Sequence, residues 1–388
     1  MSERVVRLDE VCEINPRAPK GMDDDEHVSF LPMAAVSEDG RIEYQEARKA
    51  GEVKKGYTYF ERGDVLLAKI TPCFENGKAA RTFDLSTHRG FGSSEFHVIR
   101  PAKEVLADYI FYILWNTSFR EVGALNMTGS AGQKRVPADF LKRLEIPLPP
   151  LDEQRRIAAI LDKADALRQK RKQAIVLLDS MTHAIFLEMF GEPTENPRGF
   201  PVQDLGKIGS LERGVSKHRP RNDPTLLGGD YPLIQTGDVS NSGGYIRAYC
   251  STYSEQGLRQ SKLWPAGTLC ITIAANIART GILTFPACFP DSVVGFQSPC
   301  SNLVEYVRVW LSFLQKTLEQ NAPTVAQKNI NLEILRNLPI AVPPKELLHI
   351  FGRRISFLAK LEREQQRSAS YFEANFTSLQ SRAFSGQL

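Results

Sequence analysis

The chain has 388 residues, too many for one ordinary hydrophobic core, so two or more domains are expected. Hydrophobic residues make up 42% and charged residues 24%, which excludes a disordered or collagen-like chain. The net charge of +4 permits nucleic-acid binding without requiring it. No uninterrupted apolar stretch is long enough to span a membrane, and the first residues lack a signal core. We therefore expect a cytoplasmic protein.

The six cysteines form no C-x-x-C pair and the six histidines are scattered, which argues against a structural zinc site. We expect no metal in this chain and mostly buried, reduced thiols.

Residues 1–148 are predicted to form a first mixed module. Short apolar runs at Val65–Ala68 and 96–99 are separated by Gly, Pro, Asn and Asp and read as strands. Residues 106–115 read as a short helix. This module is therefore mixed α and β, with strands predominating.

A long helix is predicted over 149–191. Pro149-Pro150 is tolerated at a helix start, and Asp152-Glu153 is favourable at the positive helix N-terminus. Apolar residues then recur at helical spacing until Gly191 and Pro193 end the run.

The same order of parts follows in the second half. Residues 192–342 are predicted to form a second mixed module, with a strand at 269–273 and a helix at 304–318. Pro343-Pro344 then opens a second long helix over 343–388, which Gly386 ends.

An internal repeat connects the halves. From residue 133 to residue 190 the two copies align without a gap at an offset of 194, with Gln133-Lys134 against Gln327-Lys328. Upstream the match is looser: 63–66 resembles 267–270, and Gly77 is matched to Gly281 at an offset of 204. Leu8, Val11 and Ile14 are matched to Leu205, Ile208 and Leu211.

Each helix carries an apolar stripe, with a polar middle, that is too long for its own module to cover. We predict an α+β fold in which the two helices pack antiparallel as a coiled coil, giving an internal pseudo-two-fold axis. The alternative is that each helix lies across its own module. Two separated modules suit a bipartite, non-palindromic duplex site, because dimeric readers use the same geometry on half-sites.

The chain resembles the specificity subunit of type I restriction-modification systems. The resemblance rests on Phe190-Gly191, on the stretch 64–72, and on Ile146-Pro147-Leu148-Pro149-Pro150-Leu151-Asp152-Glu153-Gln154 before the helix. It implies a non-catalytic subunit that binds double-stranded DNA, two methylation subunits and restriction subunits. S-adenosylmethionine and ATP are then expected on those partners, with no cofactor in this chain. The second copy departs from the pattern, because Pro343-Pro344-Lys345-Glu346 lacks the Asp-Glu-Gln.

Catalytic motifs are also missing from the sequence. Neither Pro-Pro pair follows Asn or Asp and precedes an aromatic residue, as an adenine methyltransferase requires, and no Walker pattern occurs. The sequence therefore predicts that the chain is not itself an enzyme.

Candidate DNA contacts are cationic and polar side chains on the modules. In the first module they are Lys69, Thr71, Asn76, Lys78, Arg81, Arg89, Ser93 and Ser94. In the second they are Arg213, Lys217, His218, Arg219, Thr272, Asn276, Arg279 and Gln297. The repeated segment adds Gln133, Lys134, Arg135, Gln327, Lys328 and Asn329. The shared Gln-Lys pairs suit phosphates, whereas Arg135 and Asn329 differ and could read different bases.

Two other functions stay open from the sequence. The helix pair could serve a scaffold protein with no DNA role, which predicts no salt-sensitive duplex binding. An orphan methyltransferase would bind S-adenosylmethionine by itself.

Overall fold

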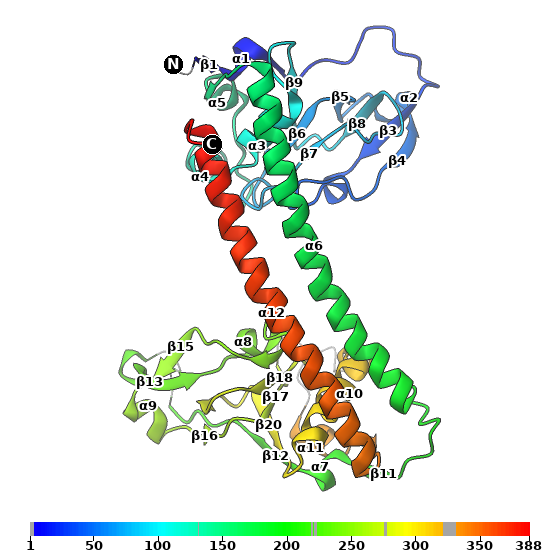
Figure 1. Cartoon of the computed structure of the whole chain (residues 1–388), viewed down its shortest axis with the longest axis vertical. Helices are drawn as coiled ribbons and strands as arrows, with labels where there is room; N and C mark the ends of the chain where they lie inside the picture. Colours follow the sequence, from blue (N-terminus) through cyan, green and yellow to red (C-terminus); the bar gives the residue numbers. More distant parts are fainter. Residues whose placement is uncertain (1–3, 131, 219, 221–222, 275–277, 321–330) are drawn as a thin grey trace. The chain divides into compact units, whose positions relative to one another are not determined.

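The computed structural model describes residues 4–388 apart from 131, 219, 221–222, 275–277 and 321–330 (Figure 1). Two compact units make up the chain. Unit 1 comprises Met1–Lys172 and Arg367–Leu388, and unit 2 comprises Gln173–Gln366. Each unit thus contains one mixed module and a part of both long helices, α6 (Leu151–Phe190) and α12 (Lys345–Phe384).

Unit 1 is built on two four-stranded sheets. The first has the order β2-β9-β6-β7 and is antiparallel throughout. The second has the order β4-β3-β8-β5, in which β3 and β8 run parallel. The strands are β1 (Val5–Arg7), β2 (Cys12–Ile14), β3 (His27–Leu31), β4 (Glu46–Lys49), β5 (Thr58–Glu61), β6 (Val65–Ala68), β7 (Ala79–Arg81), β8 (Arg89–Gly92), β9 (Phe96–Pro101) and β10 (Glu145–Pro147).

Short helices cover these sheets, and β1 pairs with β10 where the module joins α6. The helices are α1 (Leu8–Val11), η1 (Met33–Ala35), α2 (Ala50–Val53), α3 (Ala107–Leu114), α4 (Thr117–Leu125) and α5 (Ala138–Lys142). The largest core cluster of unit 1 brings α3 together with Ile157 and Leu161 of α6 and Phe376 of α12.

Unit 2 repeats this plan with one added strand. Its first sheet has the order β12-β20-β17-β18-β14 and its second the order β15-β13-β19-β16, again with a parallel pair, β13 and β19. The strands are β11 (Val202–Asp204), β12 (Ser210–Arg213), β13 (Leu227–Leu233), β14 (Gly244–Ile246), β15 (Ser251–Tyr253), β16 (Leu263–Trp264), β17 (Leu269–Thr272), β18 (Thr280–Leu283), β19 (Ala287–Cys288), β20 (Val293–Gln297) and β21 (Pro339–Ala341).

The helices of unit 2 also follow unit 1, and β11 pairs with β21 as β1 does with β10. They are α7 (Leu205–Ile208), η2 (Pro224–Leu226), α8 (Thr236–Ser240), α9 (Glu255–Arg259), α10 (Ser301–Gln320) and α11 (Leu332–Arg336). Its core cluster combines α10 with Phe186 and Phe190 of α6 and Phe351 of α12. The predicted α+β fold with two long helices is confirmed.

Strand register corrects one detail of the predicted repeat. Val65 pairs with Arg81, and Leu269 at the corresponding place pairs with Ile282, so β7 and β18 do not follow the offset of 204. Gly77 therefore corresponds to Ala278, and both have a positive φ, of 84° and 57°. Gly281 instead lies inside β18. The physical reason is that the connection between β17 and β18 is shorter than that between β6 and β7.

The two long helices contact each other in antiparallel directions within each unit. In unit 1, Arg156 donates to the carbonyl oxygen of Leu388 at 3.0 Å, and Arg168 pairs with Glu373 at 2.8 Å. In unit 2, Phe190 lies 5.1 Å from Phe351 between ring centroids. Each helix also packs on its own module, so the two predicted alternatives both describe real contacts.

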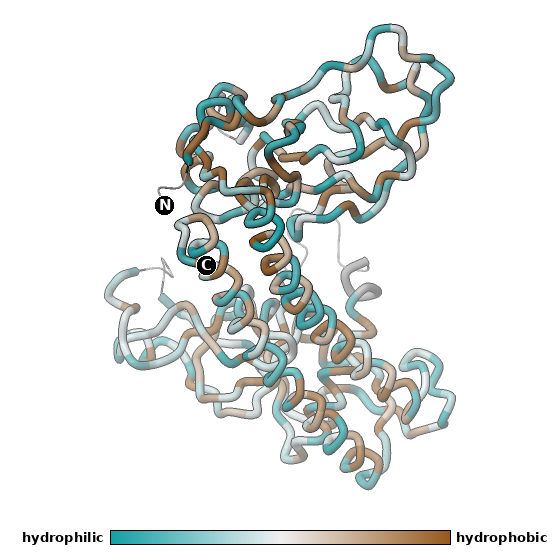
Figure 2. The backbone as a smooth tube through the Cα atoms, turned by 45° about the horizontal axis from the view of Figure 1, so that its top comes forward, coloured by the Kyte–Doolittle hydropathy of each residue, from teal (hydrophilic) through white to brown (hydrophobic). Residues whose placement is uncertain are grey.

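By length and composition, α6 is the one helix among the described residues with a stretch apolar enough to cross a membrane, although polar and charged residues interrupt it. Figure 2 shows hydrophilic and hydrophobic residues mixed along this helix. Phe186 and Phe190 in its second half are buried in the core of unit 2.

All six cysteines are free, and Cys12, Cys270 and Cys288 are buried.

Candidate nucleic-acid interface

Three segments of the first module converge beside the end of β6. They are the connection 69–78, the turn 93–95 between β8 and β9, and residues 132–136. Lys69 donates its backbone N–H to Glu95 at 2.9 Å, and Thr71 donates to Lys134 at 2.9 Å. Isolated bridges join Arg135 to both Ile70 and Thr128. We call this surface the module-1 face.

The module-1 face gathers seven of the predicted contacts: Lys69, Thr71, Ser93, Ser94, Gln133, Lys134 and Arg135. Ser94, Gln133 and Lys134 are exposed, and the others are partly exposed. The Thr71 hydroxyl donates to Glu75 at 2.8 Å, and Ser93 Oγ accepts from the backbone of Glu95 at 3.2 Å. Residues separated by more than 60 positions therefore share one surface.

An ion pair that the sequence analysis missed lies at the centre of this face. Arg135 donates from Nε and Nη2 to the two carboxylate oxygens of Glu95, at 2.9 and 2.8 Å. The hydrogen bond from Arg135 holds the pKa of Glu95 below its usual value. Glu95 could have been suspected only as an acidic residue beside Ser93-Ser94, because its partner is 40 residues away.

Two further candidates lie on the same connection but are already engaged. Asn76 donates to the Glu38 carboxylate at 2.8 Å, and Lys78 Nζ donates to the carbonyl oxygen of Met33 at 3.3 Å. These bonds tie the connection 69–78 to the segment around η1.

Two predicted arginines make ion pairs outside the module-1 face. Arg81 pairs with Asp108 of α3 at 2.6 Å and Asp162 of α6 at 2.8 Å, so it links β7 to both helices. Arg89 pairs with Glu26 at 3.1 Å. The guanidinium of Arg81 thus has a structural role that the sequence analysis did not foresee.

In the second module the candidates fall into exposed and engaged groups. Arg213, Lys217 and Arg279 are exposed. His218 pairs with Asp223 at 3.1 Å, and Gln297 donates to Thr268 at 3.1 Å. Thr272 is 0% exposed, so its hydroxyl is not available to DNA; it accepts from the backbone N–H of Arg279 at 3.1 Å. Arg219, Asn276, Gln327, Lys328 and Asn329 lie outside the described residues.

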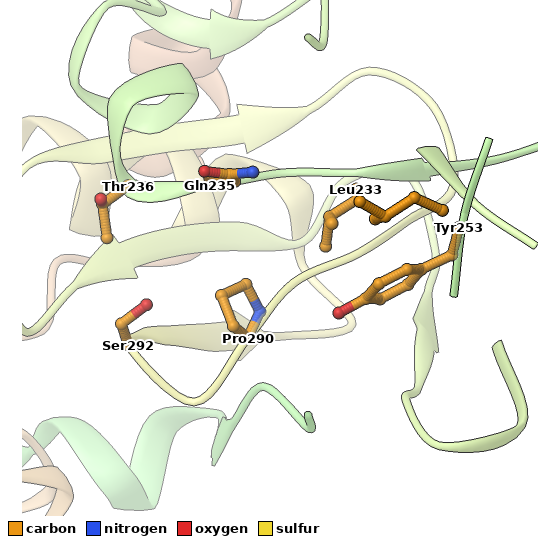
Figure 3. Close-up of a pocket in the computed structure, with 7 residues that line it drawn as sticks. Leu233, Gln235, Thr236, Tyr253, Pro290 and Ser292 are labelled. Atoms are coloured by element: carbon orange, nitrogen blue, oxygen red, sulfur yellow. The ribbon is translucent and has the colours of Figure 1, made fainter. Parts of the chain in front are cut away.

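A pocket of about 290 Å³ borders the corresponding turn of the second module. Ile273 donates its backbone N–H to Ser292 at 3.0 Å, which repeats the bond from Lys69 to Glu95 and places Ser292 where unit 1 has Glu95. Figure 3 shows Leu233 and Tyr253 at one end of the pocket and Thr236 and Ser292 at the other. The remaining lining residues are Leu227, Gln235 and Pro290.

The Gln of the Pro-Pro-Leu-Asp-Glu-Gln motif has a structural role. Gln154 is 0% exposed. Its Oε1 accepts from the backbone of Leu106 at 2.9 Å, and its Nε2 donates to Glu104 at 3.0 Å and Pro149 at 2.9 Å. It therefore joins the start of α6 to the start of α3. Among the residues that the structure describes, no group of His, Cys, Asp or Glu side chains is placed to hold a metal ion.

Comparison with known proteins shows which family has this repeated architecture. The model of the type I restriction modification DNA specificity domain matches residues 3–177 and again 198–373. The chain belongs to this family. The two matches follow the two copies of the repeat, as the resemblance implied.

Individual relatives agree with that assignment. The specificity subunits of the type I restriction enzymes EcoEI and EcoAI of Escherichia coli are 44% and 42% identical over 179 and 180 residues, which is 45% of this chain. The matched region spans only 30% of the length of each relative.

Solved structures share the fold across nearly the whole chain. The type I S subunit from M. genitalium matches with a TM-score of 0.58 at 13% identity, over 99% of this chain and 96% of that one. A chain from a study of type I R-M complex assembly and conformational transition has the same TM-score at 20% identity, over 99% and 98%.

Proposed function

We propose that the chain is the DNA-specificity subunit of a type I restriction-modification complex and reads a bipartite, non-palindromic site. The observation that carries the proposal is the repeated sheet order with different side chains at the corresponding turns. The frame β2-β9-β6-β7 recurs as β12-β20-β17-β18, while Glu95 becomes Ser292. One frame with two sets of surface residues suits recognition of two different half-sites.

Partners would supply the chemistry. Two methylation subunits would bring S-adenosylmethionine and restriction subunits would bring ATP, and this cytoplasmic chain would be non-catalytic. Exposed apolar side chains on α6, including Val176, Leu177 and Met181, offer a surface that a protein partner could bury. The names of the relatives, all specificity subunits of type I restriction enzymes, support this assignment.

The direct test is co-expression with a methylation subunit, followed by sequencing that maps modified adenines. Two short conserved half-sites separated by an unread spacer are expected. A single continuous motif, or no modification, would contradict the proposal. Salt-sensitive binding of the complex to duplex DNA separates it from a scaffold function, and S-adenosylmethionine binding by the isolated chain would favour an enzyme instead.

A further inference from the structure

The backbone around Arg135 is held without help from its side chain. Arg135 and Thr128 exchange two backbone hydrogen bonds, of 2.8 and 3.0 Å, and Val136 donates to Lys69 at 2.9 Å. His97, which is buried, lies 2.8 Å through Nε2 from the carbonyl oxygen of Val136. The position of the segment therefore does not depend on the pair between Arg135 and Glu95.

The ion pair adds orientation rather than stability. The side chains of Arg135 and Glu95 are 41% and 25% exposed, and ion pairs so accessible to water contribute little to the free energy of unfolding. A bidentate contact nevertheless fixes the plane of the guanidinium. Glu95 is itself anchored, because its backbone accepts from Lys69 and donates to Ser93 Oγ.

The remaining donors of Arg135 match one base. Among the residues that the structure describes, Nε, Nη2 and Nη1 each donate once, the last to the carbonyl oxygen of Gln133 at 2.9 Å. Arginine has five N–H donors, so one remains on each terminal nitrogen. Two donors from one guanidinium are the group that binds O6 and N7 of guanine in the major groove.

We infer that Arg135 reads a guanine in the half-site bound by the first module, and that Glu95 is the positioning residue that orients it. This inference rests on the proposed function. In the second module Ser292 takes the place of Glu95, and the sequence has Asn329 where the first module has Arg135, so neither partner of the ion pair recurs at its corresponding position. This contact by Arg135 is therefore expected in the half-site that the first module binds.

The test maps methylated adenines in cells that express the full chain with its methylation subunit. Three variants are compared with the wild type: Arg135→Lys, Glu95→Gln and Arg48→Ala. Arg135→Lys keeps the charge, and so the attraction to phosphate, but loses the bidentate fork. Arg48→Ala is the matched control, because Arg48 also pairs with an exposed glutamate, Glu46, in the same module but outside the module-1 face.

Arg135→Lys is expected to lower the preference for guanine at one position about 10- to 100-fold, the range that one bidentate base contact provides. Glu95→Gln relaxes the same position less. The other half-site and the spacer length stay unchanged in both variants, which also shows that the chain is folded.

Three results would overturn the inference. Arg135→Lys could weaken methylation equally at every site without altering the motif, the altered position could be an A·T pair, or Arg48→Ala could relax the same position. If instead the wild-type chain directs no bipartite methylation, the proposed function itself fails.

Discussion

The contact between the long helices is built from different charged residues in the two units. In unit 1, Arg168 of α6 is 8% exposed by side chain and pairs with Asp165 and with Glu373 of α12, both at 2.8 Å. At the offset of 194, the corresponding residues of unit 2 are Glu362 and Asp179, two carboxylates. Unit 1 thus has a buried arginine at this helix contact, whereas both corresponding helix positions of unit 2 carry carboxylates, and Arg247 and Arg308 of the second module act on Glu362.

The same contrast occurs where the helices begin. Gln154 clamps α6 to α3 in unit 1, whereas its counterpart Leu348 is 3% exposed and part of the core of unit 2. Aligning β20 with β9 by strand register places Leu303 where unit 1 has Leu106. Its backbone N–H needs no side-chain partner, because it donates to the carbonyl oxygen of Cys300, just before α10, at 3.0 Å. The repeat therefore preserves helix position and spacing while the chemistry of the contacts changes, and substitutions in both units sharpen that comparison.

The largest effect is expected from Phe186→Ala in unit 2. Phe186 is 0% exposed and contacts the rings of Phe190, Tyr306 and Phe351. Removing a buried phenylalanine side chain costs about 3–5 kcal/mol of unfolding free energy. The loss of unfolding free energy is measured by urea denaturation, with hydrogen exchange as the probe that reports each unit separately.

The matched control for that substitution is Gln380→Ala, because Gln380 occupies the corresponding place in unit 1. Gln380 is 3% exposed and its Nε2 has no hydrogen-bond partner among the described residues. Losing an unpaired buried amide offsets the lost packing, so a cost below about 1 kcal/mol is expected. Equal costs at the two positions would contradict the asymmetry.

Arg168→Met should destabilise unit 1 by about 3 kcal/mol, because it removes the buried cation that pairs with both Asp165 and Glu373. It also removes the cation stacked 4.7 Å from the Phe376 ring centroid. Denaturation by urea checks the value. The double variant with Glu373→Gln should recover part of the loss; no recovery would show that charge is not the cause.

Gln154→Ala should cost unit 1 about 2 kcal/mol, since it removes a fully buried side chain and leaves backbone groups of Leu106, Glu104 and Pro149 without this partner. Hydrogen exchange at the N–H of Leu106 should accelerate. In unit 2, Leu348→Ala should leave hydrogen exchange at the backbone N–H of Leu303 slow, because this N–H donates to the carbonyl oxygen of Cys300 and not to the side chain of residue 348. Fast exchange at both positions would refute the proposed difference.

The smallest effect is opposite pH dependence in the two units. Burial raises the pKa of Glu362 even though Arg247 and Arg308 lower it, so the folded state binds this proton more tightly and stability falls as pH rises above the unfolded value of 4.5. Despite burial, Lys172 lowers the pKa of Asp39, so that stability is present above the unfolded value of 3.8 and lost as pH falls through the folded value.

Two neutral variants separate these effects. At pH about 7, Glu362→Gln should be more stable than the wild type and Asp39→Asn less stable, and both differences should shrink towards pH about 3. Thermal denaturation across this range measures them. Differences independent of pH would show that neither carboxyl group is responsible.

Local signals in the sequence determined the frame. Pro149-Pro150 and Pro343-Pro344 set where the long helices begin, and the apolar run Val65–Ala68 is a strand within the predicted bounds. These features depend on the backbone constraint of proline and on the local spacing of apolar residues, both of which can be seen in a short stretch of sequence. The offset of 194 could be read because both copies retain those signals.

Only the tertiary structure decided which polar groups meet. Glu95 and Arg135 are brought together by the bridge from Ile70 to Arg135, and Arg81 reaches Asp162 because β7 packs near α3 and α6. The sequence alignment matched Gly77 to Gly281, whereas strand register shows that Gly77 corresponds to Ala278. The connection before β18 is shorter than the one before β7, so the two copies differ in offset there. Side-chain partners depend on contacts between distant elements, and spacing along the chain does not encode them.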